Sequence, residues 1–186
     1  MLVLASRSPR RSEILRQAGI PFIVRAAPVD ETPFAAERPL DYVRRLAALK
    51  TQATPAAPGE IVLGADTTVV VENEILGKPA DSADARRMLA MLSGRRHEVI
   101  TGICLRLAGA EALCDHAVTG VWFAGMTDRE IEDYIASGEP MDKAGAYAIQ
   151  GLAAKFIERI EGCYFNVVGL PVALLYRHLR ALQNVC

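Results

Sequence analysis

The stretch Leu2-Val3-Leu4-Ala5-Ser6-Arg7-Ser8-Pro9-Arg10-Arg11-Ser12-Glu13 changes from an apolar run to a charged helical pattern. The apolar run at its start predicts a short buried strand. Ser8 suits the N-cap position, and Pro9 suits the first helical position because its missing N–H would be unpaired there anyway. The stretch therefore predicts a strand that leads directly into the N-terminus of a helix.

The polar residues at this junction are typical of an anion site. Ser6, Ser8, Arg10 and Arg11 lie where free backbone amides and the helix dipole attract negative charge. Two arginines in a first turn oppose that dipole, and a bound polyanion would resolve the conflict. From the residues alone two interpretations stay open, namely a phosphate site and a pair of arginines that extend into solvent.

Two more charged residues, Glu31 and Lys50, lie in the segments that follow this helix. A strand is expected at 22–24, followed by a proline-rich loop at 27–33 that contains Glu31. Apolar residues at intervals of three and four predict a helix over 39–53, with Lys50 near its end. Glu31 in an exposed acidic pair and Lys50 at a helix C-terminus both have ordinary structural explanations.

The most strand-like segment of the chain is 61–71, and Asp66 lies in its middle. Aspartate is disfavoured inside strands, and a buried carboxylate requires a partner or a cation. Gly64 leaves room for another group to approach the backbone. A functional role for Asp66 is favoured over a local hydrogen bond to Thr67 or Thr68. A turn at 72–74 predicts a hairpin in which Lys78 faces Asp66.

The rest of the chain predicts alternating helices and strands. We expect a helix at 81–92, long strands at 97–107 and 112–123, and a helix opened by a capping box at Thr127. The glycine-rich stretch 137–151 is expected to include a short strand at 146–149 that ends at Gln150. A further strand is expected at 156–160, and the last helix begins at Pro171.

Composition limits the classes of protein. The chain has 186 residues, of which 51% are hydrophobic, and a net charge of −1, which predicts a globular protein without broad nucleic-acid binding. Arginines interrupt the first apolar run, so no signal peptide is expected, and no segment is long enough to span a membrane. The four cysteines lack CxxC pairs and are expected to be reduced thiols in a cytoplasmic protein.

Several common chemistries have no signature here. The three histidines lack HxxxH spacing, so neither a zinc site nor a Ser-His-Asp triad is predicted. Neither a P-loop nor a dinucleotide fingerprint is present in the sequence.

The remaining polar residues suit a nucleotide. The basic ones suit a triphosphate, and the carboxylates of Glu31 and Asp66 suit Mg²⁺, which binds few protein oxygens together with phosphates and waters. Asp66 is also a candidate to activate a water, and Gln150 offers the donor and the acceptor needed to read a base edge. The full set is Ser8, Arg10, Arg11, Glu31, Lys50, Asp66, Lys78 and Gln150.

Four motifs together resemble the Maf family of nucleoside triphosphate pyrophosphatases, also called septum formation inhibitors. They are Ala5-Ser6-Arg7-Ser8-Pro9-Arg10-Arg11, Gly64-Ala65-Asp66-Thr67, Gly77-Lys78-Pro79 and the stretch from Asp142 to Gly151, DKAGAYAIQG. The resemblance covers nearly the whole chain and keeps the family's order. It implies one Maf-like domain over 1–186, with a mixed α/β fold like that of inosine triphosphate pyrophosphatase. Such a fold has a twisted sheet, flanking helices and two lobes around a central cleft.

The resemblance also implies an activity and roles for individual residues. A nucleoside triphosphate is hydrolysed to the monophosphate and pyrophosphate with a divalent metal, Mg²⁺ or Mn²⁺. The family's catalytic aspartate falls on Asp66, which also binds metal together with Glu31. Homodimer formation and a cytoplasmic location are family-level expectations. The substrate-binding positions fall on Ser8, Arg10, Arg11, Lys50, Thr67, Lys78 and Gln150.

The substrate branch depends on one position of the first motif. The branch that acts on 7-methyl-GTP has a tryptophan after the motif's proline, where this chain has Arg10. Arg10, Thr67 and Gln150 instead match the branch that acts on dTTP and UTP. Alternative hypotheses are a pyrophosphatase for 7-methyl-GTP, a broad house-cleaning pyrophosphatase, and a nucleotide-binding regulator of septum formation without turnover.

Overall fold

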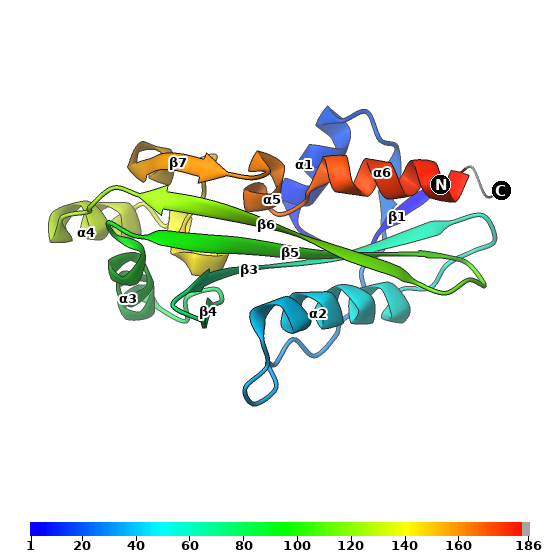
Figure 1. Cartoon of the computed structure of the whole chain (residues 1–186), viewed down its shortest axis with the longest axis horizontal. Coiled ribbons are helices and arrows are strands. Elements are labelled where there is room, and N and C mark those ends of the chain that lie inside the picture. Colours follow the sequence, from blue (N-terminus) through cyan, green and yellow to red (C-terminus); the bar gives the residue numbers. More distant parts are fainter. Residues whose placement is uncertain (184–186) are drawn as a thin grey trace. The chain divides into compact units, whose positions relative to one another are not determined.

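The computed structural model describes residues 1–183 and shows a mixed α/β architecture with one seven-stranded sheet (Figure 1). The strand order is β2-β1-β3-β5-β6-β7, with β4 paired to β3. Strand β1 is parallel to β2 and to β3, whereas β3–β4 and β6–β7 are antiparallel. The strands are β1 Leu2–Leu4, β2 Phe22–Val24, β3 Ile61–Val71, β4 Glu74–Leu76, β5 Arg96–Leu107, β6 Leu113–Phe123 and β7 Ile157–Glu161. The α-helices are α1 Pro9–Gln17, α2 Pro39–Ala53, α3 Ser82–Leu92, α4 Asp128–Ala136, α5 Tyr164–Val168 and α6 Val172–Gln183.

The chain divides into two compact units. The first unit comprises Met1–Thr67, Thr101–Ala117 and the C-terminal part from Gly169. The second unit comprises Thr68–Ile100 and Val118–Val168. Strands β3, β5 and β6 each contribute residues to both units, so the chain passes from one unit to the other within each of these strands.

In the first unit, α2 packs directly on the backbone of the sheet. A Cβ atom added to Gly64 of β3 would lie 2.2 Å from the Ala47 carbonyl oxygen, and one added to Gly102 of β5 would lie 2.5 Å from that of Val43. Only glycine permits such a close approach. The two glycines therefore bring α2, which carries Lys50, onto the strand that carries Asp66.

In the second unit, a hydrophobic core forms between the sheet and its helices. Apolar residues of α3 and α4 pack with the second half of β3 and with β5 and β6. Within this core the rings of His97, Phe123 and Tyr147 meet edge to face, at centroid distances of 4.8–5.3 Å. The buried members are Val69, Val71, Leu76, Ala85, Met88, Leu89, Leu92, Val99, Val121, Phe123, Ile131, Tyr134, Ala146, Tyr147, Ala153 and Phe156.

Most of the predicted elements are confirmed. Ser8 caps α1 by accepting a hydrogen bond from the Arg11 N–H, and Thr127 forms the predicted capping box with Glu130. The predicted strand at 146–149 is wrong, because a 3-10 turn at Ala144–Ala146 is followed by irregular chain up to Gln150. Side chains from elsewhere in the second unit hold this segment, as described below.

The prediction of reduced cysteines is also wrong for one pair. Cys104 of β5 and Cys114 of β6 form a disulfide. Their ten-residue separation carries no CxxC pattern, and the strands that bring them together are joined by the turn between them. Cys163 is free, and Cys186 lies outside the described residues. Among the described residues, no helix is both long and apolar enough to cross a membrane.

Candidate functional site

Lys50 joins the two carboxylates predicted to act together. Its Nζ lies 2.8 Å from Glu31 Oε1 and 2.7 Å from Asp66 Oδ1. The three side chains come from the loop before α2, from the last turn of α2 and from the middle of β3. The structure thus brings Glu31, Lys50 and Asp66 together within the first unit, and Asp66 has the cationic partner that its position requires.

Asp66 is the buried member of this group, with 7% of its surface exposed. Burial raises the pKa of Asp66 above its usual value, although the charges of Lys50 and then Arg11 act in the opposite direction. A carboxylate with a raised pKa is a better proton acceptor than an ordinary aspartate. Asp66 therefore has the chemical character of a general base.

Glu31 owes its position to two residues of α2 that sequence reasoning missed. The Tyr42 hydroxyl donates to the Glu31 carbonyl oxygen at 3.0 Å, and Arg45 Nη2 donates to the Thr32 carbonyl oxygen at 3.1 Å. Arg45 also pairs with both oxygens of Glu37, each at 2.6 Å. Burial raises the pKa of Tyr42 to about 12, so its hydroxyl remains a donor. Tyr42, Arg45 and Lys50 share α2, but nothing in the sequence indicated where the loop would lie.

Arg11 is buried rather than solvated. Its guanidinium donates to the Gly169 carbonyl oxygen at 2.9 Å, to Ser6 Oγ at 3.0 Å and to Thr67 Oγ1 at 3.2 Å. None of these acceptors carries a formal charge, and burial lowers the pKa of Arg11. A buried positive charge at a helix N-terminus, held by neutral groups, suits an anionic ligand. Of the residues involved, only Gly169 was given no part in the site by the sequence, where Ser6 already lay in the predicted anion site.

The other predicted residues of α1 lie at the same helix end. Ser8 is half-buried, and its Oγ accepts from the Arg11 N–H while its own N–H donates to Ser6 Oγ. Arg10 is half-buried in the first helical turn. Thr67 Oγ1 lies 2.9 Å from Thr101 Oγ1 and follows Asp66 directly. Within the first unit, Arg11 thus contacts both Ser8 and Thr67.

Lys78 and Gln150 belong to the second unit, and both are exposed. The β3–β4 hairpin is confirmed, with Val69 paired to Leu76 and Val71 to Glu74. These pairs end before Lys78, so its predicted position opposite Asp66 stays a prediction.

The donor set of the first unit fits a hard divalent cation. Among the described residues there is no cluster of three histidine, cysteine or acidic side chains that suits a metal. Glu31 and Asp66 nevertheless lie within contact distance of one ammonium group. Mg²⁺ is commonly held by one or two carboxylates together with substrate phosphates and waters, and two carboxylates meet that requirement.

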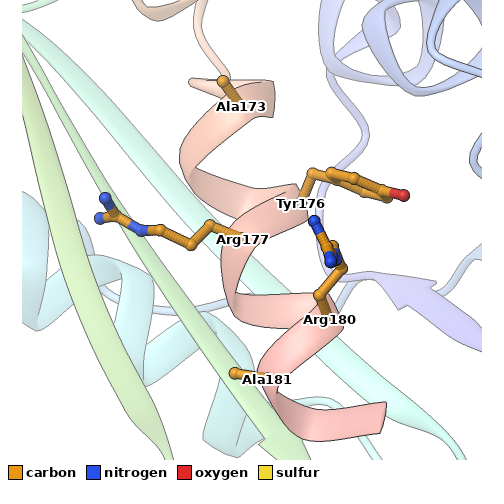
Figure 2. Close-up of a pocket in the computed structure, with 5 residues that line it drawn as sticks. All are labelled: Ala173, Tyr176, Arg177, Arg180 and Ala181. Atoms are coloured by element: carbon orange, nitrogen blue, oxygen red, sulfur yellow. The ribbon is translucent and has the colours of Figure 1, made fainter. Parts of the chain in front are cut away.

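Two other features of the first unit lie outside this group. His178 Nε2 lies 2.8 Å from Asp115 Oδ2, so this histidine has an acidic neighbour that the sequence did not reveal. A pocket lies along α6, where Tyr176 and Arg180 extend from one side of the helix and Arg177 from the other (Figure 2). None of the predicted site residues lines this pocket.

The fold and these contacts define a mixed α/β protein with a cluster of charged side chains beside a helix N-terminus, in which Asp66 and Arg11 are buried. The family model described as Maf-like protein matches residues 1–182. The dTTP/UTP pyrophosphatase of Symbiobacterium thermophilum is 55% identical over 92% of this chain and 88% of its own length. The dTTP/UTP pyrophosphatase of Koribacter versatilis is 53% identical over 96% and 93%. The chain belongs to the Maf family, which confirms the resemblance seen in its motifs.

A solved structure supports the fold. The Ham1 protein of Staphylococcus aureus aligns with a TM-score of 0.55 over 97% of this chain and 98% of that one, at 16% sequence identity. At this identity the likeness concerns the fold alone. The predicted mixed α/β fold is confirmed.

Proposed function

We propose that this protein hydrolyses dTTP and UTP to the nucleoside monophosphate and pyrophosphate. The observation that carries the proposal is the buried Asp66 carboxylate held by Lys50, with Arg11 buried close by. Relatives named dTTP/UTP pyrophosphatase are more than half identical over nearly their full length, which supports the same chemistry here.

In the proposed reaction, Asp66 accepts a proton from a water molecule that attacks the α-phosphorus. The bond from that phosphorus to the bridging oxygen breaks, and pyrophosphate leaves with the electron pair. Lys50 orients the Asp66 carboxylate, and Arg11 with the α1 N-terminus stabilises charge on the phosphates. Asp66 then returns its proton to solvent, which completes the turnover.

A divalent cation, Mg²⁺ or Mn²⁺, belongs to the proposal. Glu31 and Asp66 would hold it together with phosphate oxygens, and when bound it would offset negative charge on the triphosphate. Lys50 contacts the same two carboxylates and limits their mutual repulsion. Ser8 and Arg10 are proposed to bind phosphate oxygens at the α1 N-terminus.

The base preference rests on the resemblance to the family. Arg10, Thr67 and Gln150 are proposed to favour thymine or uracil over a purine, and Lys78 is proposed to bind phosphate. The amide of Gln150 supplies both a donor and an acceptor, which a pyrimidine edge requires. We also propose that the protein is cytoplasmic and forms a homodimer. Sedimentation of the purified protein would test the homodimer.

The test is a substrate panel with product chromatography. Purified protein with Mg²⁺ or Mn²⁺ is given dTTP, UTP, dATP and 7-methyl-GTP, and both products are identified. We expect dTMP and UMP with pyrophosphate, and the highest kcat/KM for dTTP and UTP. A higher kcat/KM for 7-methyl-GTP, or equal values across the panel, would overturn the pyrimidine preference. Binding without turnover would instead identify a regulator.

A further inference from the structure

The segment that carries Gln150 is fastened on both sides while Gln150 itself is exposed. Two residues before Gln150, the Ala148 N–H donates to the Tyr134 hydroxyl at 3.2 Å. Two residues after it, the Leu152 N–H donates to Glu139 at 3.0 Å to Oε1 and 3.1 Å to Oε2. The segment is irregular, so these bonds replace those that a strand or helix would supply.

Tyr134 and Glu139 are themselves joined. The Tyr134 hydroxyl donates to Glu139 Oε1 at 2.7 Å, and burial, followed by this hydrogen bond, raises the pKa of Tyr134. The hydroxyl thus remains protonated, donating to Glu139 and accepting from Ala148. Tyr134 lies in α4 with 3% of its surface exposed, so a helix fixed in the core anchors the pair.

Gly151 lets the Glu139 carboxylate lie against the segment. A Cβ atom added to Gly151 would come within 2.1 Å of Glu139 Oε2. No other residue type would leave the carboxylate in place beside the Leu152 N–H. The contacts therefore form one unit, which we call the Gln150 clamp and define as Tyr134, Glu139 and Gly151.

We propose that the Gln150 clamp sets base selectivity by holding the backbone on both sides of Gln150, so that Tyr134 and Glu139 are positioning residues for the base-reading amide. This inference rests on the proposed function, because it requires that Gln150 reads the base. A side-chain amide discriminates between bases only when its donor and acceptor are fixed in direction. An exposed glutamine on irregular chain obtains that direction from its backbone.

The experiment separates base reading from hydrolysis. Tyr134→Phe, Glu139→Ala and Gly151→Ala each remove one part of the clamp, and Gln150→Ala removes the reader. Each is assayed for kcat/KM on dTTP, on dATP and on methyl triphosphate, which has no base. Glu132→Ala, an exposed substitution on α4, and Gly125→Ala, where an added Cβ meets nothing within 4 Å, are the matched controls.

We expect each clamp variant to lower the dTTP-to-dATP ratio of kcat/KM by about fivefold, the effect of one lost hydrogen bond, through a higher KM for dTTP. Methyl triphosphate hydrolysis should match wild type in the same variants. In a double-mutant cycle, Glu139→Ala should lower selectivity no further once Gln150 is alanine. In Gly151→Ala only the flexible end of Glu139 has to move, so this variant stays folded even if Glu139→Ala does not.

The outcomes distinguish the base-reading role of Gln150 from the positioning role of the Gln150 clamp. If Gln150→Ala lowers the ratio and the clamp variants do not, the positioning role is wrong and the proposed function stands. An equal loss of methyl triphosphate hydrolysis in the clamp variants would also overturn it, because the clamp would then be merely structural. If Gln150→Ala leaves the ratio unchanged, the base-reading part of the proposed function fails, and the clamp's role fails with it.

Discussion

Asp66 combines properties that rarely occur together in one residue. It lies inside an apolar strand, it is almost fully buried, and it keeps a direct contact with Lys50. Desolvation and ion pairing act on its pKa in opposite directions, and burial dominates. The result is a carboxylate that is ion-paired and yet has a raised pKa, which is why we propose Asp66 as the general base.

Removing the charge of Asp66 tests its role directly. Asp66→Asn keeps the shape of the side chain but cannot accept a proton, so kcat for dTTP should fall by about two orders of magnitude. Circular dichroism should show a folded protein. Asp41→Asn, a change in the first turn of α2 at a side chain that is 45% exposed, is the control. Near-normal turnover in Asp66→Asn would remove Asp66 from the role of general base.

Arg11 is the second residue whose contacts support the proposed triphosphate site. Arg11→Lys keeps the charge but loses the planar guanidinium that reaches three acceptors, so KM for dTTP should rise by about tenfold. Added salt should raise KM further in both proteins. Arg7→Lys, at an exposed neighbouring position, is the control. An unchanged KM in Arg11→Lys would mean that Arg11 serves the fold alone.

At the scale of elements, α2 is the scaffold of the first unit's charged cluster. Its close contact with β3 and β5 at Gly64 and Gly102 sets the position of Lys50. The same helix fastens the preceding loop through Tyr42 and Arg45. One helix thus determines where Glu31 and Lys50 lie relative to Asp66.

A substitution that loosens the loop before α2 should lower activity although the substituted residue is not one of the predicted site residues. Arg45→Ala loses the bidentate pair with Glu37 and the bond to Thr32, and the free energy of unfolding should fall by about 1–3 kcal/mol. Proteolysis within 27–38 should become faster, and kcat/KM should fall. Arg44→Ala, at an exposed position one residue earlier, is the control. Equal proteolysis of this loop in both variants would contradict the fastening role.

The sequence predicts elements better than it predicts how elements meet. Apolar periodicity indicated α2 correctly, a run of strand-forming residues indicated β3, and the rule against a lone buried charge indicated that Asp66 needs a partner. Contacts between segments distant in the sequence decide which lysine pairs with Asp66 and how Arg45 holds the loop before α2. The predicted strand at 146–149 failed for the same reason, since its Ala148 N–H donates to the hydroxyl of Tyr134 from α4 rather than to a neighbouring strand. The Cys104–Cys114 bond depends on which strands are neighbours.

At the scale of the whole molecule, His97 links stability to pH. It is 1% exposed, its Nε2 lies 2.8 Å from the Tyr147 hydroxyl, and burial lowers its pKa to about 3. The unfolded chain binds a proton at this histidine near pH 6.5, whereas the folded protein does not. The contribution of His97 to stability is therefore complete above pH 6.5 and is lost as the pH falls from there towards 3.

We therefore expect the free energy of unfolding, measured with urea, to fall as the pH is lowered from 6 to 5. His97 should account for roughly 1 kcal/mol of that decrease. His97→Gln should be less stable at pH 7, and its deficit relative to wild type should shrink as the pH falls. His116→Gln is the matched control, because His116 is half-exposed. A deficit that stays constant with pH would contradict the prediction.

The most direct test of the central claim is hydrolysis of dTTP in water enriched in oxygen-18, with mass analysis of both products. Attack of a water activated by Asp66 on the α-phosphorus predicts one labelled oxygen in dTMP and none in pyrophosphate. Label in pyrophosphate, or the formation of dTDP and orthophosphate, would contradict the proposed mechanism.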